Sequence, residues 1–366
     1  MKVGILTQPM HWNYGGILQN WALQQVLREM GHEPIKLERV DNSKSMYRKI
    51  KADVKTRALR LFGKGRNRAL THPFAPARLS LKGLDLKYSK NIYDSGTLKY
   101  VAKRVDAIIV GSDQVWRQDY SPCITDFFLG FIDNTDRRLR ISYAASFGKA
   151  DGYMSEDKMD ECRKLIKRFS SISVRENEGI DILRDDFDIS DVSLVLDPTL
   201  LLSAKDYVRI MPCEKKPAKP YISAYILDET VSKLELLNKV MAHSGIADYD
   251  LIGTKFDKCA GARVPSIGEW ISSIANAKIV VTDSFHGMAF SLIFHRPFVV
   301  IANAERGIDS YKTVLKPLGL MDRLVCSKDM DIEAILSQDV DWTFVDSYLN
   351  EQKSLSKMFL KASLRQ

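Results

Sequence analysis

The chain has 366 residues, of which 45% are hydrophobic and 27% charged, so it has an ordinary globular composition and enough length for two domains. Lysine and arginine exceed aspartate and glutamate by 54 to 46, and a net charge of +8 favours an anionic partner such as a charged substrate, a membrane surface or nucleic acid. The five cysteines form no C-x-x-C pair, and no run of 18 apolar residues is present. We therefore expect a reduced, cytoplasmic protein without a signal peptide, zinc site, disulfide or membrane-spanning helix.

The chain opens with a predicted strand at 2–7, a loop, and an amphipathic helix that ends at Gly31. Asn13, Gly15 and Gly16 lie in this loop, where glycine allows a ligand to approach the backbone closely. The pattern is not G-x-G-x-x-G, so no dinucleotide fingerprint is present. An ordinary glycine-rich turn explains the same residues equally well.

A basic insertion occupies about 41–102. Within it, residues 44–68 carry ten lysines and arginines but one acid, and 47–61 places its apolar residues on one helical face. Such a helix favours contact with an anionic membrane surface, although its apolar side could equally pack on its own domain. Few aromatic residues interleave with the charges, so we expect no nucleic-acid binding.

Two buried strands in the first half of the chain are followed by residues that could take part in catalysis or ligand binding. The strand at 106–110 is followed by Ser112 and Asp113, which places the carboxylate where parallel sheets contact ligands. An Asx turn that caps the next segment is the competing interpretation of Asp113. The strand at 171–174 is followed by Arg175, whose guanidinium could clamp a carboxylate or phosphate. A salt bridge to a neighbouring glutamate, Glu176 or Glu178, is the alternative.

A polar, proline-marked stretch at 203–220 predicts a domain boundary. We expect an N-terminal α/β domain at 1–203, a C-terminal α/β domain at 204–345, and a closing helix at 346–366 that crosses back. Strands and helices alternate in both halves, which predicts two Rossmann-like parallel sheets facing each other across a cleft.

The most informative stretch is KIVVTDSFHGMAFSLIF at 278–294. An apolar strand runs directly into a helix through a polar turn that contains Asp283, Ser284, His286 and Gly287. The helix N-terminus would face a ligand, and histidine can exchange a proton near neutral pH. The plainer alternative is that the first two residues cap the helix and that the histidine only satisfies the turn.

This stretch strongly resembles the signature of the polysaccharide pyruvyl transferase family. Four further stretches resemble the family in the same order along the chain: NYGGILQNWAL, VGSDQVWR, SVRE and VLDPTLLL. The resemblance implies a glycosyltransferase-B-like architecture. It also implies transfer of pyruvate from phosphoenolpyruvate onto two hydroxyls of a sugar, with formation of a cyclic ketal.

The resemblance suggests roles for the candidate residues. His286 would donate a proton and Asp113 would act as the base. Arg175, Ser284, Gly287 and Arg306, with His286, would bind phosphoenolpyruvate, and Lys312 competes with Arg306 for that role. Asn13, Gly15, Gly16, Ser112 and Asp113 would line the acceptor cleft. We expect no metal and no cofactor other than the donor substrate.

Family members that build surface polysaccharides are expected to act on lipid-linked acceptors at the inner face of the membrane, which would suit a peripheral membrane enzyme.

Two other classes of protein remain open. One is a sugar-nucleotide-dependent glycosyltransferase, for which Glu305 is the nearest nucleotide-binding carboxylate. The other is a non-catalytic protein that binds sugar or membrane.

Overall fold

The structure is a computed structural model that describes residues 1–10, 13–41, 81–212, 217, 219–228, 230–252, 265–303, 307–326 and 330–365. Three sequence predictions lie outside these residues: the basic helix at 47–61, the donor-binding Arg306 and the nucleotide-binding Glu305.

The first domain is built on a parallel sheet with strand order β2-β1-β3-β4. Two short strands, β5 and β6, pair with each other and extend this sheet through isolated bridges from β4 and from the residues that follow it. Every residue of β3 is buried, as expected for a parallel strand covered on both faces. The strands are β1 (Lys2–Leu6), β2 (Glu33–Lys36), β3 (Ala107–Val110), β4 (Leu139–Ser142), β5 (Ser173–Val174) and β6 (Ser193–Leu194).

The first helix begins earlier than the sequence predicts. Asn13 is its N-cap and its side chain accepts a hydrogen bond from Gly16 N, so Gly15 and Gly16 lie in the first helical turn and the loop prediction for them is wrong. The helices of this half are α1 (Tyr14–Glu29), α4 (Ser95–Ala102), α5 (Glu156–Ile166), α6 (Asn177–Phe187) and α7 (Ala204–Val208), with short 3-10 turns η1 (Leu81–Gly83), η2 (Gln118–Tyr120), η3 (Ile124–Phe128) and η4 (Pro198–Leu201).

The second domain has a parallel sheet with strand order β11-β10-β9-β7-β8. Its strands are β7 (Ile222–Tyr225), β8 (Tyr249–Ile252), β9 (Ile279–Thr282), β10 (Phe298–Ile301) and β11 (Leu324–Val325). Its helices are α8 (Val231–Ser244), α9 (Ile267–Asn276), α10 (Phe285–Ile293), α11 (Asp309–Leu315) and α12 (Ile332–Ser337), with a 3-10 turn η6 (Met321–Arg323).

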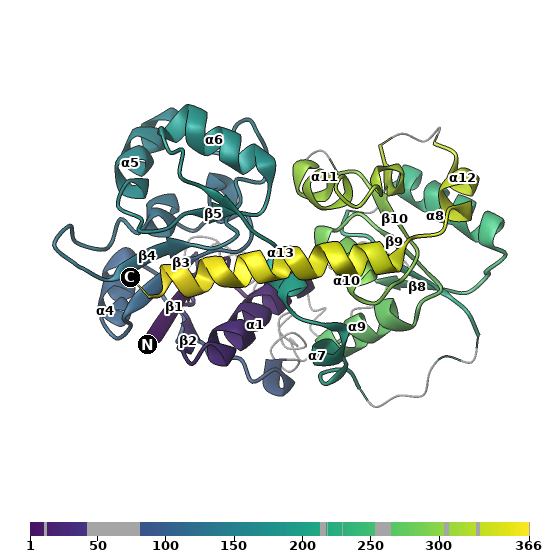
Figure 1. Cartoon of the computed structure of the whole chain (residues 1–366), viewed down its shortest axis with the longest axis horizontal. Helices are drawn as coiled ribbons and strands as arrows, with labels where there is room; N and C mark the ends of the chain where they lie inside the picture. The colour runs from purple at the N-terminus through teal and green to yellow at the C-terminus, as the bar shows by residue number, and fades with distance from the viewer. Residues whose placement is uncertain are drawn as a thin grey trace, which may run out of the picture.

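The last helix, α13 (Trp342–Ser363), runs from the second domain across the first and ends near the N-terminus (Figure 1). Its buried Ser356 accepts a hydrogen bond from Leu196 N at 2.9 Å, and Phe359 packs on Tyr143 with ring centroids 6.3 Å apart. The helix therefore joins both domains.

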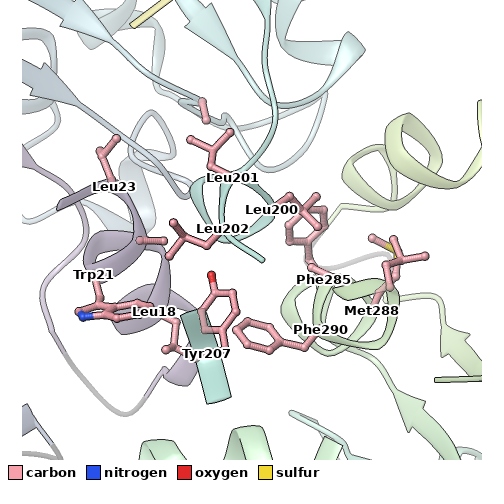
Figure 2. Close-up of a cluster of buried hydrophobic side chains, with 14 of the residues drawn as sticks. Leu18, Trp21, Leu23, Leu200, Leu201, Leu202, Tyr207, Phe285, Met288 and Phe290 are labelled. Atoms are coloured by element: carbon pink, nitrogen blue, oxygen red, sulfur yellow. The ribbon is translucent and has the colours of Figure 1, made fainter. Parts of the chain in front are cut away.

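One hydrophobic cluster runs through both domains. Figure 2 shows Tyr207 between Trp21 of α1 and Phe290 of α10, and Leu200 of η4 beside Phe285. The ring centroids of Tyr207 lie 5.6 Å from Trp21 and 4.7 Å from Phe290. The α/β fold with two Rossmann-like domains is confirmed, and the domains meet along a buried apolar seam.

The packing of α13 gives a stability prediction. Leu360 is completely buried in this cluster, so Leu360→Ala should lower the free energy of unfolding by about 2–5 kcal/mol in urea titration. Leu355 on the same helix is 47% exposed, and Leu355→Ala should change that free energy by no more than about 0.5 kcal/mol. Equal losses in the two variants would show that α13 is not held by its buried face.

Candidate active site

A buried carboxylate, Asp197, stands at the centre of the site. It follows β6 and caps η4, and its Oδ1 accepts hydrogen bonds from Thr199 N at 3.0 Å and Thr199 Oγ1 at 2.7 Å. Its Oδ2 accepts from Ser112 Oγ at 3.1 Å and from Arg175 Nη1 at 3.0 Å. A buried carboxylate needs such partners, because desolvation of an unpaired charge is very costly.

Arg175 is shared among three carboxylates. Besides the bond to Asp197, its Nε lies 3.3 Å from Glu176 Oε2 and its Nη2 lies 3.7 Å from Asp113 Oδ1. The Phe285 ring covers the guanidinium at 5.0 Å from its centroid. The salt bridge to Glu176 is therefore present, but it is one of three. The guanidinium fixes the acids around it, and its role as a donor clamp stays a prediction.

His286 reaches this cluster from the other domain. It lies in the first turn of α10, is 6% exposed, and places Nε2 at 3.8 Å from Asp197 Oδ1. That distance is too long for a hydrogen bond, and Nε2 has no hydrogen-bond partner among the residues the structure describes. Gly15 of α1 packs over the ring, because a Cβ there would lie 2.0 Å from His286 Nδ1.

The pKa values of His286 and Asp197 are shifted by burial and by the neighbouring charges. Burial lowers the pKa of His286, Arg175 acts in the same direction, and the carboxylates of Asp197 and Asp113 oppose them. Burial alone would raise the pKa of Asp197, but His286, Arg175 and Thr199 hold it below its ordinary value. At neutral pH the pair is therefore an ionised carboxylate beside an imidazole that resists protonation in the free protein.

Two of the predicted acceptor-side residues support the cluster from the end of β3. Asp113 has a φ of +80°, which holds its carboxylate toward Arg175, and its Oδ1 accepts from Gln114 N at 2.9 Å. A Cβ at Gly16 would lie 3.6 Å from Asp113 Oδ2. Ser112 is buried and donates to Asp197. The structure thus brings Ser112, Asp113 and Gly16 together with His286 and Arg175. Asn13 caps α1 nearby.

The polar residues in the turn between β9 and α10 do not cap α10 with their side chains, as the simpler interpretation of the sequence would require. Ser284 is at the N-cap position, but its side chain makes no capping hydrogen bond. The buried Asp283 instead reaches the end of β7, where its carboxylate accepts from Leu227 N at 2.6 Å and Asp228 N at 3.2 Å. Lys233 Nζ neutralises it at 2.6 Å. This carboxylate connects two strand ends.

Gly287 packs within its own domain. A Cβ there would lie 2.2 Å from Thr282 Oγ1, so the glycine lets the first turn of α10 approach β9. Of the two candidate cations after β10, Lys312 is exposed on α11, whereas Arg306 lies outside the described residues. Gly307, the residue after Arg306, packs closely on the first domain: a Cβ at Gly307 would lie 1.7 Å from Gly148 O.

The sequence analysis missed the role of Asp197, although the residue lies in the stretch VLDPTLLL. An acid directly after a strand and before a proline was the available signal. The other partners of this carboxylate come from positions 112, 175 and 286, so spacing along the chain gave no indication of the pairing. Among the described residues, no group of three or more His, Cys, Asp or Glu is placed to hold a metal ion.

The model of the family described as polysaccharide pyruvyl transferase matches residues 13–305, which contain this whole cluster. The chain belongs to the polysaccharide pyruvyl transferase family. It is therefore a transferase of polysaccharide modification, as the resemblance predicts. Among curated proteins, none matches the sequence.

Solved structures resemble this pyruvyl transferase in fold. They include a Listeria monocytogenes protein provisionally described as a UDP-N-acetylglucosamine 2-epimerase (TM-score 0.54, 9% identity, 98% of this chain and 90% of that one). Staphylococcus aureus MnaA with UDP has a TM-score of 0.52, 11% identity and coverage of 96% and 87%. An Arabidopsis thaliana protein complexed with UDP-L-rhamnose has a TM-score of 0.51 and 10% identity, over 96% of this chain and 94% of that one. The glycosyltransferase-B architecture is confirmed.

The contact between α1 and the histidine gives a test of the site. Gly15→Ala should displace His286, since the new Cβ would overlap the ring, and a 1 Å misplacement in a site costs about 100-fold in activity. Gly83→Ala on η1 is the control, because Gly83 is exposed and a Cβ there would meet no atom within 4 Å. Transferase assays of both variants test this. Full activity in Gly15→Ala would contradict the packing.

The electrostatic pairing of Asp197 with His286 can be tested directly. Asp197 raises the pKa of His286, so Asp197→Asn should lower that pKa further and move its titration to more acidic pH. NMR titration of the imidazole in both proteins measures the change directly. A histidine that titrates at the same or a higher pH in the variant would show that the two residues are not electrostatically paired. Near-ultraviolet circular dichroism of the variant verifies that its fold is retained.

Proposed function

We propose that this pyruvyl transferase moves pyruvate from phosphoenolpyruvate onto two hydroxyls of a sugar to form a cyclic ketal. The observation that carries the proposal is the pairing of His286 with Asp197 across the domain seam, at the N-terminus of α10. A histidine held against a carboxylate, with a second carboxylate in electrostatic reach, provides an acid and a base for one reaction centre.

The reaction needs little more than proton transfer and charge stabilisation. Protonation at C3 of phosphoenolpyruvate makes C2 electrophilic, and one sugar hydroxyl adds there to form the first C–O bond. The C2–O bond to phosphate then breaks and a second hydroxyl adds. Of the two hydroxyl protons, one balances the proton delivered to C3 and the other leaves with inorganic phosphate.

In this scheme His286 delivers the proton to C3 and Asp113 takes one from the sugar hydroxyl. The low pKa of the free imidazole suits a group that becomes a cation only when a ligand of high negative charge arrives. Asp197 then stabilises the imidazolium. Arg175 holds both carboxylates in place through its ion pairs with them.

The donor carries a carboxylate and a phosphate. The start of α10, with Gly287 in its first turn, offers backbone N–H groups and the positive end of a helix dipole. Ser284 would contribute its hydroxyl, because its own N–H donates to Thr282 Oγ1 at 3.1 Å. Arg306, which lies outside the described residues, adds a cation in the same proposal, as the resemblance implies. Departure of phosphate is favoured by the same positive groups.

The end of β7 argues against a nucleotide-sugar donor. In open α/β sheets, anionic ligands occupy the carboxyl ends of the strands, where free backbone N–H groups meet them. Here the N–H groups of Leu227 and Asp228 are already used by the carboxylate of Asp283. A diphosphate would have to displace a buried ion pair, so a smaller donor beside His286 is favoured.

For the acceptor we propose a sugar of a polysaccharide precursor, carried on a lipid at the inner face of the membrane. The net charge of +8 supports contact with an anionic bilayer, through the basic segment at 47–61. In the part of the chain that the structure describes, no helix has the length and apolarity needed to cross a bilayer. The attachment that we propose is peripheral.

The direct test is incubation with phosphoenolpyruvate and a panel of lipid-linked and aryl glycosides, followed by mass spectrometry and phosphate assay. We expect the acceptor to gain the mass of pyruvate less water, with one phosphate released per product. Gain of a hexose from a nucleotide sugar would replace the proposal with a glycosyltransferase. Binding of glycosides without turnover of any donor would indicate a non-catalytic protein.

The proton donor can be tested by substitution. His286→Ala should reduce turnover by about 10²–10⁴-fold while the protein stays folded, because a general acid typically contributes that much. His243→Ala, at an exposed position on α8, is the control and should behave like the unsubstituted protein. Near-normal turnover in a folded His286→Ala protein would remove the histidine from the mechanism.

A further inference from the structure

Two buried amides on α1 have no role in the scheme above. Gln19 and Asn20 are each 1% exposed, and the nitrogen and oxygen of both side chains lack a hydrogen-bond partner among the described residues. A buried amide without partners costs about 1–3 kcal/mol relative to an apolar side chain. Two adjacent ones in a helix that is otherwise well packed therefore call for a functional explanation.

Helix geometry directs these amides to the site. Gln19 lies four residues after Gly15 and three after Gly16, which puts it on the helix face that those glycines share. Side chains in a helix lean toward its N-terminus, so Gln19 extends back over the turn that faces His286 and Asp113. Asn20 lies four residues after Gly16 and is oriented likewise.

The same region holds other polar atoms without partners. His286 Nε2 and Glu176 Oε1 are buried and make no hydrogen bond within the described part of the chain. Both residues adjoin the Asp197 cluster, Glu176 through Arg175 and His286 directly. Unused hydrogen-bonding capacity is thus present beside this carboxylate, as expected of a site that is completed by a ligand.

The charge of the cluster indicates what the amides are for. One guanidinium, Arg175, faces the three carboxylates of Asp113, Glu176 and Asp197. An anionic ligand placed there meets more negative than positive charge. Neutral N–H donors can bind its oxygens without adding desolvation of a further ion, and in a buried site such hydrogen bonds are strong.

We propose that the side-chain N–H groups of Gln19 and Asn20 bind anionic oxygens of the three-carbon donor and hold it beside His286. The inference rests on the proposed function and deepens it, since it makes α1 of the first domain part of the donor site. The two domains then share the donor, with the amides contributed by α1 and the histidine by α10.

The test separates binding from folding. Gln19→Met and Asn20→Leu keep the approximate side-chain volume and remove the polar atoms. We expect both proteins to melt at the same temperature as the unsubstituted protein or higher, because an unpaired buried amide is lost. We also expect phosphoenolpyruvate to bind at least about tenfold more weakly by calorimetry and to raise the melting temperature less.

Gln24 provides the matched control on the same helix. It is also fully buried, but its amide exchanges hydrogen bonds with the backbone of Lys87 at 2.8 and 3.0 Å. Gln24→Met should therefore lower the melting temperature and leave the dissociation constant for phosphoenolpyruvate unchanged. Gln19→Glu adds a negative charge and should weaken binding more than Gln19→Met does.

The outcomes are distinguishable. Gln19→Met and Asn20→Leu proteins that bind phosphoenolpyruvate as tightly as the unsubstituted protein would overturn the amide assignment and leave the proposed function intact. An unsubstituted protein that does not bind phosphoenolpyruvate would overturn both. Pyruvate and inorganic phosphate as separate probes identify the oxygens: the probe whose affinity falls in the variants carries the group that the amides hold.

Discussion

The structure depends on keeping one buried carboxylate satisfied. Asp197 takes hydrogen bonds from Ser112, Thr199 and Arg175 in the first domain, and faces His286 of the second. Removing one partner of such a group costs about 3–5 kcal/mol, because the remaining charge stays buried. Its hydrogen bonds come from three separate stretches of the first domain, so folding of that domain satisfies the charge. Docking of the second domain then brings His286 against the carboxylate and completes the cluster.

Close packing between the domains around this carboxylate explains why two positions are glycine. Gly15 admits the His286 ring against α1, and Gly307 admits the backbone of Gly148. Larger side chains at either position would push the domains apart. The apolar part of the seam, with Tyr207 between rings of both domains, supplies the burial that holds them together. Because proteins pack as densely as crystals, the polar cluster beside this seam is held to a narrow range of distances.

The balance of charge separates two kinds of anion site in this fold. At the end of β7, Asp283 occupies the backbone N–H groups itself and is neutralised by Lys233, so that site is complete without a ligand. Around Asp197 the acids outnumber the guanidinium, and His286 Nε2 has no hydrogen-bond partner among the described residues. A ligand therefore has hydrogen bonds to gain at the second place, next to the histidine.

The sequence by itself determined the parallel α/β architecture and the positions of Arg175 and His286, because apolar strands and the polar residues that follow them are local patterns. It did not determine that Gly15 belongs to a helix, since Asn13 caps α1 and the helix begins at Tyr14, before the two glycines that the sequence places in a loop. Only the tertiary structure showed that Asp197 joins the histidine. Pairing between residues 89 positions apart depends on the crossing of strands and the docking of domains, which local spacing does not encode.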